Sequence, residues 1–98
     1  MRIVDKKPSP QELVSLIESV VRQIEPEAVV QKGTDSIVVY MHHITDKKLR
    51  DERMTHIISS IPIAYRKYVE LKEKEGIRYP YTLTYTIESL KTGFRITL

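Results

Sequence analysis

Three histidines are the residues of this sequence whose type could support metal or proton-transfer chemistry: His42, His43 and His56. Neighbouring side chains in a strand point to opposite faces, so His42 and His43 cannot hold one metal ion together if they lie in a regular strand. His43 and His56 could meet across two elements, with a carboxylate as third ligand, but no ligand spacing such as H-E-x-x-H is present. We expect structural or surface roles for all three, with no bound metal and no cofactor.

Nucleophilic catalysis has little support in the sequence. The chain has no cysteine, which excludes thiol nucleophiles, disulfides and thiolate metal sites. Thr55 precedes His56, but such a pair lacks the third group that orients a catalytic base, and no G-x-S-x-G motif or glycine-rich phosphate loop occurs. Asp51 and Glu52 lie among basic residues, as in a salt-bridged surface. We expect a protein that is not an enzyme.

Basic residues offer a different chemistry, namely contact with the phosphates of a nucleic acid. The chain has a formal net charge of +3. Four cations are clustered in the middle of the chain and one lies near its end; the candidate phosphate contacts are Lys47, Lys48, Arg50, Arg53 and Arg95. Acidic residues are interleaved with them, which argues against a continuous basic track. Sequence-independent binding of DNA or RNA is therefore the alternative hypothesis for function.

The first expected element is a helix that begins at Pro10 and stops near Glu25. Ser9 can cap it, Pro10 suits the first helical position, and Glu12 can complete a capping box. Apolar residues then recur at spacings of three and four, so one face of the helix should be buried. The next proline should end the helix. Residues 1–8, ahead of the cap, are expected to form a flexible tail.

Two strands are predicted next, over residues 28–31 and 36–44, joined by a turn that contains Gly33 and Asp35. In the second strand, the odd-numbered and the even-numbered residues both include several apolar ones, so neither face of the strand is polar. Such a strand is expected at the centre of a sheet with both faces covered. One domain of 98 residues rarely covers both faces, so a second subunit is the natural cover for one of them.

Residues 45–76 allow two interpretations. An apolar row at helical spacing favours a helix capped by Thr45 or Asp46, whereas the β-branched residues before Pro62 also suit a strand; helix is preferred. Pro62 then either kinks one long helix or, with a serine two residues earlier as cap, begins a second helix. Gly76 is expected to end the helical region in the left-handed conformation.

The end of the sequence has the clearest periodicity. Apolar and polar residues alternate over residues 79–88 and again over 94–98, on either side of a turn at Gly93, which predicts a hairpin with one apolar and one threonine-rich face. Three tyrosines share the parity of the apolar residues, so we expect them in the core and not as a platform for stacked bases. The last strand is expected to offer a free sheet edge to a partner.

Together these elements predict a single α+β domain over residues 1–98. It should have two layers in the order helix, hairpin, helical region, hairpin, with the helices on one face of a mainly antiparallel four-stranded sheet. The expected function is that of a small non-catalytic binding or accessory protein that forms a homodimer and acts as a subunit or regulator of a larger assembly, for example a nucleic-acid-processing one. The residues expected at the self-association surface are Phe94, Ile96, Leu98, Val38 and Tyr40.

Composition also bears on location and source. No stretch of the chain approaches the roughly 20 apolar residues that span a bilayer, and the first residues lack the pattern of a signal peptide. We therefore expect a cytoplasmic location and no membrane partner. Asparagine is absent and 30% of residues are charged, a balance typical of proteins from hot environments.

Overall fold

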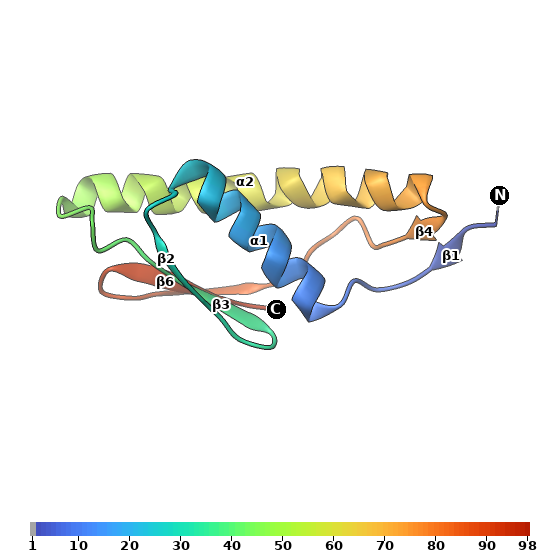
Figure 1. Cartoon of the computed structure of the whole chain (residues 1–98), viewed down its shortest axis with the longest axis horizontal. Coiled ribbons are helices and arrows are strands. Elements are labelled where there is room, and N and C mark those ends of the chain that lie inside the picture. The colour runs from blue at the N-terminus through green and yellow to red at the C-terminus, as the bar shows by residue number, and fades with distance from the viewer. Residues whose placement is uncertain (1) are drawn as a thin grey trace.

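A computed structural model describes residues 2–98 as an elongated molecule with extents of 51 × 21 × 18 Å. Two helices form one layer and a twisted sheet forms the other (Figure 1). The elements, in chain order, are β1 (Val4–Asp5), α1 (Pro10–Ile24), β2 (Val29–Lys32), β3 (Ser36–Tyr40), α2 (Lys47–Lys74), β4 (Ile77–Arg78), β5 (Thr86–Ser89) and β6 (Gly93–Thr97). The predicted α+β architecture is confirmed.

The main sheet contains β2, β3, β6 and β5 in that spatial order, and all neighbouring strands are antiparallel. The register places Ile37 opposite Ile96 and Val39 opposite Phe94. All four side chains are fully buried. They point toward α1 and α2, which together cover this one face of the sheet.

The core between the layers is made by apolar rows at the spacings expected from the sequence. Its helical members include Ile17, Val21, Ile57 and Ile61, all with no exposed surface. A second cluster joins α1 and α2 to the segment that follows β4, and its buried members are Leu13, Tyr65, Val69 and Tyr79. The helices are therefore fixed to the sheet at one end of the molecule and to an extended segment at the other.

The start of α1 has the predicted capping box. The side chain of Ser9 accepts a hydrogen bond from the Glu12 backbone N–H at 3.2 Å, and the Glu12 carboxylate accepts one from the Ser9 N–H at 2.7 Å. Pro10 occupies the first turn, where its missing N–H would have no helical acceptor. These local contacts determine where the helix begins.

The middle region forms one helix of 28 residues, α2, which continues through Pro62. Of the two interpretations, helix is therefore correct, and no second helix begins there: the hydroxyl of Ser60 donates to the carbonyl of His56 at 2.8 Å instead of capping a new helix. Asp46 is the N-cap, and its carboxylate accepts the Lys48 N–H at 3.0 Å. Gly76 follows the helix with a φ of 84°, the predicted left-handed conformation.

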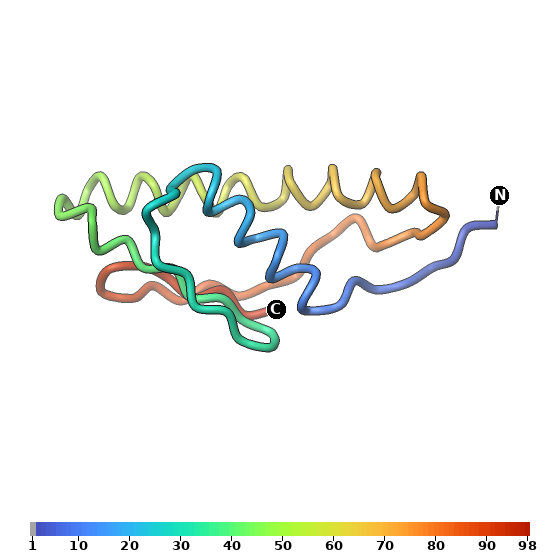
Figure 2. The backbone as a smooth tube through the Cα atoms, in the orientation of Figure 1, coloured from blue at the N-terminus to red at the C-terminus, as the bar shows by residue number. Residues whose placement is uncertain are grey.

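The prediction for the terminal hairpin was only partly correct. Its first strand is limited to Thr86–Ser89, because residues 79–85 pair with no strand and instead run back beneath α2 toward the sheet (Figure 2). Its second strand, β6, lies between β3 and β5. The expected free edge at this strand is therefore wrong, since both of its sides are hydrogen-bonded; the sheet edges are β2 and β5.

The amino-terminal segment has main-chain partners that the sequence did not indicate. Of residues 1–8, the first lies outside the described residues, while Val4 and Asp5 form a short parallel pair with Ile77 and Arg78. The Val4 N–H donates to the carbonyl of Gly76 at 2.8 Å. These main-chain partners come from the extended segment after α2, which local sequence could not reveal.

Candidate interaction surfaces

A carboxylate at the start of α1 is the centre of the strongest polar cluster, the Glu12 cluster, formed by Ser9, Glu12, Tyr68 and Tyr79. One oxygen of Glu12 accepts the hydroxyl protons of Tyr68 at 2.7 Å and Tyr79 at 2.8 Å, while the other accepts the Ser9 N–H at 2.7 Å. The cluster thus connects α1, α2 and the segment after β4. The tyrosine partners lie far along the chain, so sequence reasoning found only the capping contact.

The same contacts shift the ionisation of these groups. Burial alone raises the pKa of Glu12, but hydrogen bonds from Tyr68, Ser9 and Tyr79 stabilise the carboxylate more strongly and lower the pKa from 4.5 to about 2. The hydrogen bond to Glu12, with burial, raises the pKa of Tyr79 to about 12. Burial and the same carboxylate also raise the pKa of Tyr68. Near neutral pH the cluster is a fixed charge with two donors, which suits a structural role.

The predicted phosphate contacts are mostly engaged within the protein. Lys47 contacts the Asp51 carboxylate at 3.3 Å, Arg53 Nε lies 3.9 Å from Glu25 Oε2, and Arg95 is paired with Glu88 across neighbouring strands. Lys48 is exposed, and within residues 2–98 it has no ion-pair partner. The structure thus places Lys47, Lys48 and Arg53 on the first turns of α2, and Arg95 on the sheet.

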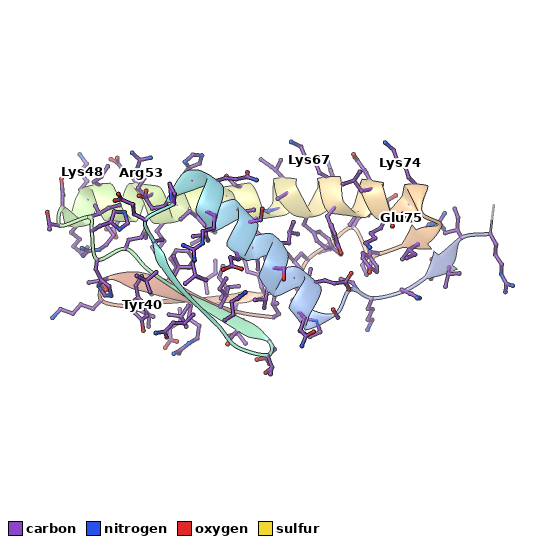
Figure 3. The ribbon with its side chains drawn as sticks, in the orientation of Figure 1. Tyr40, Lys48, Arg53, Lys67, Lys74 and Glu75 are labelled. Carbon is purple, nitrogen blue, oxygen red and sulfur yellow. The ribbon has the colours of Figure 1, made fainter. Side chains whose placement is uncertain are left out.

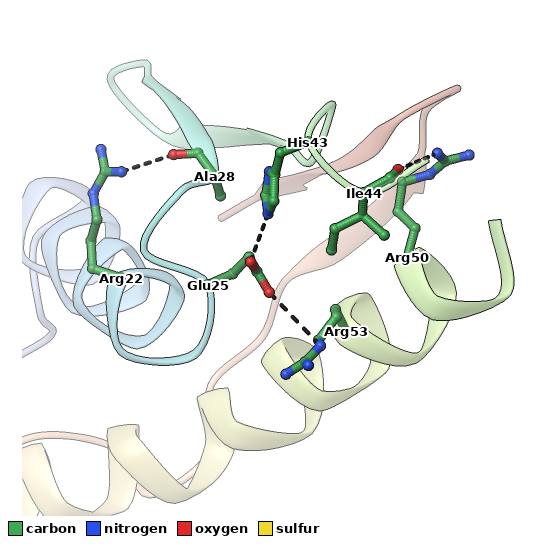
Figure 4. Close-up of polar contacts among 7 residues, drawn as sticks. All are labelled: Arg22, Glu25, Ala28, His43, Ile44, Arg50 and Arg53. Atoms are coloured by element: carbon green, nitrogen blue, oxygen red, sulfur yellow. Dashed lines mark hydrogen bonds and ion pairs between the residues drawn. The ribbon is translucent and has the colours of Figure 1, made fainter. Parts of the chain in front are cut away.

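Arg50 has the most specific environment of the five. Its guanidinium donates to the carbonyl of Ile44 at 3.0 Å and to the carbonyl of Lys91 at 3.4 Å. These contacts attach α2 to the loop before it and to the turn between β5 and β6 (Figure 4 shows the contact with Ile44). Arg50 also lines a cavity of about 280 Å³ with Lys47, Lys91 and two methionines. Its local role is structural.

The histidines lie in different surroundings from those expected. His42 and His43 follow β3 in a turn, because the strand ends at Tyr40 and not at residue 44. His43 Nε2 donates to Glu25 Oε1 at 2.6 Å, and the same carboxylate also contacts Arg53 (Figure 4). His56 lies exposed on α2. No group of three or more metal-ligating side chains occurs among residues 2–98.

One contact between a hydroxyl and an imidazole was not anticipated. A hydrogen bond of 2.9 Å joins Thr92 Oγ1 to His42 Nδ1, and the ring of His42 stacks on Tyr40 with centroids 5.0 Å apart. The pairing of Tyr40 with Gly93 brings these distant residues together. Thr55, the hydroxyl considered from sequence, donates to the Asp51 carbonyl at 3.0 Å, which is the usual back-bonding of a helical threonine.

The face of the sheet opposite the helices carries an apolar surface, the outer sheet patch, formed by Val29, Val38 and Tyr40. Tyr40 points away from the helical layer (Figure 3), and its cross-strand partner Val29 is 49% exposed. Val38 and Tyr40 are half-buried and lie on the same face of β3. The rest of this face is polar and consists mainly of Gln31, Ser36, Thr86, Glu88, Arg95 and Thr97.

The five residues predicted for self-association therefore separate into three groups. Phe94 and Ile96 are fully buried beneath the helices of their own chain, so their assignment to an intermolecular surface is wrong. The physical reason is that their side chains lie on the face of β6 that the helices cover. The sequence left open which of the two faces this would be. Val38 and Tyr40 lie on the uncovered face, and Leu98 is half-buried beside both clusters of the core.

Comparison of this chain with protein-family models, curated proteins and solved structures found no significant match. Function must therefore be inferred from geometry. Among residues 2–98, neither helix combines the length and the apolar composition that crossing a bilayer requires.

Proposed function

We propose that this chain is a non-catalytic binding protein that self-associates through the outer sheet patch and serves as a subunit or regulator of a larger assembly. The observation that carries the proposal is the position of Val38 and Tyr40. They lie at the centre of a sheet face that no helix or strand of residues 2–98 covers. An antiparallel sheet with one solvated face normally has polar residues on that face, and most of this face is polar. The apolar side chains of Val38 and Tyr40 are the exception, and a second subunit would cover them.

The geometry favours a two-fold arrangement. The patch continues from β3 onto Val29 in β2, which is an edge strand with a free row of main-chain groups. Two copies that pair along β2, or that pack these faces together, would bring their patches into one apolar area. Stable interfaces bury about 800 Å² per partner, so strand pairing would add contact area that three side chains alone do not provide.

The test is the oligomeric state. Sedimentation velocity at micromolar concentration should detect a dimer, and Val38→Lys should weaken it at least about tenfold, because a charge would then be buried in the interface. Thr86→Lys is the matched control, since Thr86 lies on the same face but on the opposite edge strand and is already exposed. A wild-type protein that stays monomeric would contradict self-association, and a dimer equally weakened by both variants would exclude this patch.

Direct binding of nucleic acid is the alternative function, and its support is narrower. Lys48 is exposed, and Lys47 lines the cavity that also contains Lys91. Lys47 also contacts Asp51, and Arg50, Arg53 and Arg95 have partners in the protein, which lowers the number of cations free to release counterions from DNA or RNA. A titration with single-stranded DNA at two salt concentrations tests it. The double variant Lys47→Glu with Lys48→Glu should reduce the affinity and its salt dependence. If the affinity and its salt dependence were unchanged in this variant, these two residues would not contact the nucleic acid.

A further inference from the structure

A groove separates α1 from α2 on the surface that faces away from the sheet's outer patch. Its volume is about 440 Å³, within the range of binding sites for small or peptidic ligands. Apolar side chains from both helices make most of its lining, among them Val20, Ile63 and Leu71, and polar side chains that include His56 and Lys67 complete it. We refer to it as the α1/α2 groove.

The apolar groups on the α2 side of the groove are unusually open to solvent. Ile63 is 61% exposed and Leu71 is 58% exposed, whereas Val20 on the α1 side is buried. The α2 residues that line the groove extend from His56 to Leu71. At about 1.5 Å per residue this is a length of about 22 Å, or roughly four turns of a helix. Exposed apolar residues beside a concave surface of this size are typical of an interaction site.

Positive charge is in excess around the groove. Among residues 2–98, Lys67 is the one lysine or arginine that lines it, and no carboxylate does. A second hollow on the other side of Ile63 contains Arg66 and Lys67 against one carboxylate, Glu70. Lys67 has no ion-pair partner within residues 2–98. Lys74, seven residues further along, projects from the same side of α2 (Figure 3).

These observations favour an occupant with its own apolar row and negative charge. We propose that the α1/α2 groove binds an acidic amphipathic α-helix of another protein. A helix fits because its side chains can lie in the groove between two helices as ridges do in helix packing, and because anchors at spacings of three, four and seven match an apolar trough of about four turns. Acidic residues beside these anchors would face Lys67, the cation that lines the groove.

A second copy of this chain is a poorer occupant. If it placed the same face of α2 in the groove, it would bring its own Lys67 close to the Lys67 of the first copy, and like charges in an interface oppose binding. Docking at the groove is independent of self-association, because the outer sheet patch lies on the other layer of the molecule. An experiment can therefore refute binding at the groove without refuting self-association, and the reverse.

The test uses two synthetic helical peptides of about 18 residues, with leucines at helical spacings of three, four and seven. One peptide has glutamates at its remaining charged positions and the other has lysines. Fluorescence anisotropy of labelled peptide against the full chain should show that the acidic peptide binds at least about tenfold more tightly. Raising the salt concentration should reduce this preference.

Variants of exposed residues locate the site without disturbing the core. Leu71→Asp should weaken binding of the acidic peptide at least about fivefold, and Lys67→Glu should weaken the acidic peptide and strengthen the basic one. Thr86→Lys, on the other layer, is the matched control and should change neither. The proposal is overturned if both peptides bind equally, if neither binds, or if Lys67→Glu leaves the preference unchanged. It is also overturned if Leu71→Asp abolishes dimerisation, because a second copy would then occupy the groove.

Discussion

Replacing Glu12 by glutamine should destabilise the protein in a way that depends on pH. The carboxylate accepts hydrogen bonds from Tyr68, Tyr79 and the backbone of Ser9, which connect α1, α2 and the segment after β4. Glutamine has nearly the same shape and can still complete a capping box. The substitution therefore removes the charge of the acceptor while leaving the packing and the cap in place.

The size of the effect follows from the pKa of Glu12. Its value of about 2, against an ordinary 4.5, corresponds to about 3 kcal/mol at roughly 1.4 kcal/mol per pH unit. Glu12 is only partly buried, so solvent screening reduces this to about 2 kcal/mol. Because the pKa is lower in the folded state, this stability is present above pH 4.5 and is lost as the pH falls toward 2.

Urea unfolding of the wild type and Glu12→Gln between pH 7 and pH 2 measures this directly. We expect the wild type to be more stable by about 2 kcal/mol at pH 7, with the difference decreasing below about pH 4.5 and nearly gone at pH 2. Glu27→Gln is the matched control, because Glu27 is exposed and has no ion-pair partner within residues 2–98. Equal stability at pH 7, or a difference that does not change with pH, would refute the assignment of charge-assisted hydrogen bonds to Glu12.

Three further substitutions test the backbone and the loop attachments by the free energy of unfolding in urea. Pro62→Ala should raise the free energy of unfolding by about 2 kcal/mol, because alanine restores an N–H donor inside α2. A loss of stability would mean that the helix is shaped around the proline. Gly93→Ala should lower the free energy of unfolding by about 3 kcal/mol, since the added Cβ would lie 1.8 Å from the Val39 carbonyl oxygen; an unchanged value would contradict this close approach. Arg50→Ala should lower it by about 1 to 2 kcal/mol by leaving two main-chain carbonyls without their donor, whereas Lys48→Ala should have little effect; equal effects would refute the anchoring role of Arg50.

Features set by neighbouring residues could be predicted from the sequence. The capping box of α1, the turn between β2 and β3, the cap of α2 at one of its two candidates, Asp46, and the left-handed Gly76 each depend on a few adjacent residues, and all were found. The order of the elements followed from periodicity in the same way. These predictions succeeded because the decisive interactions span only a few positions in the chain.

Pro62 shows where a local rule was outweighed by packing. The buried residues Ile57, Ile61, Tyr65 and Val69 recur at every fourth position on both sides of it, so one uninterrupted helix buries the whole row. Breaking the helix at the proline would have displaced half of that row from the core. The lost hydrogen bond costs less than the apolar contact that the continuous helix preserves.

Features set by distant residues could not be predicted. Alternation over residues 79–88 occurs equally in a strand and in extended chain, and only the pairing of Thr86–Ser89 with β6 decides which segment is a strand. The position of β6 inside the sheet removed the expected free edge and placed Phe94 and Ile96 in the core. The tyrosine contacts of Glu12 connect residues more than fifty positions apart, so no local pattern indicates them.

The length of α2 has a consequence for any assembly that contains this chain. The helix spans about 42 Å at 1.5 Å per residue, most of the 51 Å extent of the molecule. One of its ends is attached to the sheet by Arg50 and the other to the amino-terminal segment through the extended chain that follows Gly76. Components bound near opposite ends would therefore be held at a separation that the helix sets, as by a molecular ruler, and inserting whole turns into α2 would change that separation in steps of about 5.4 Å.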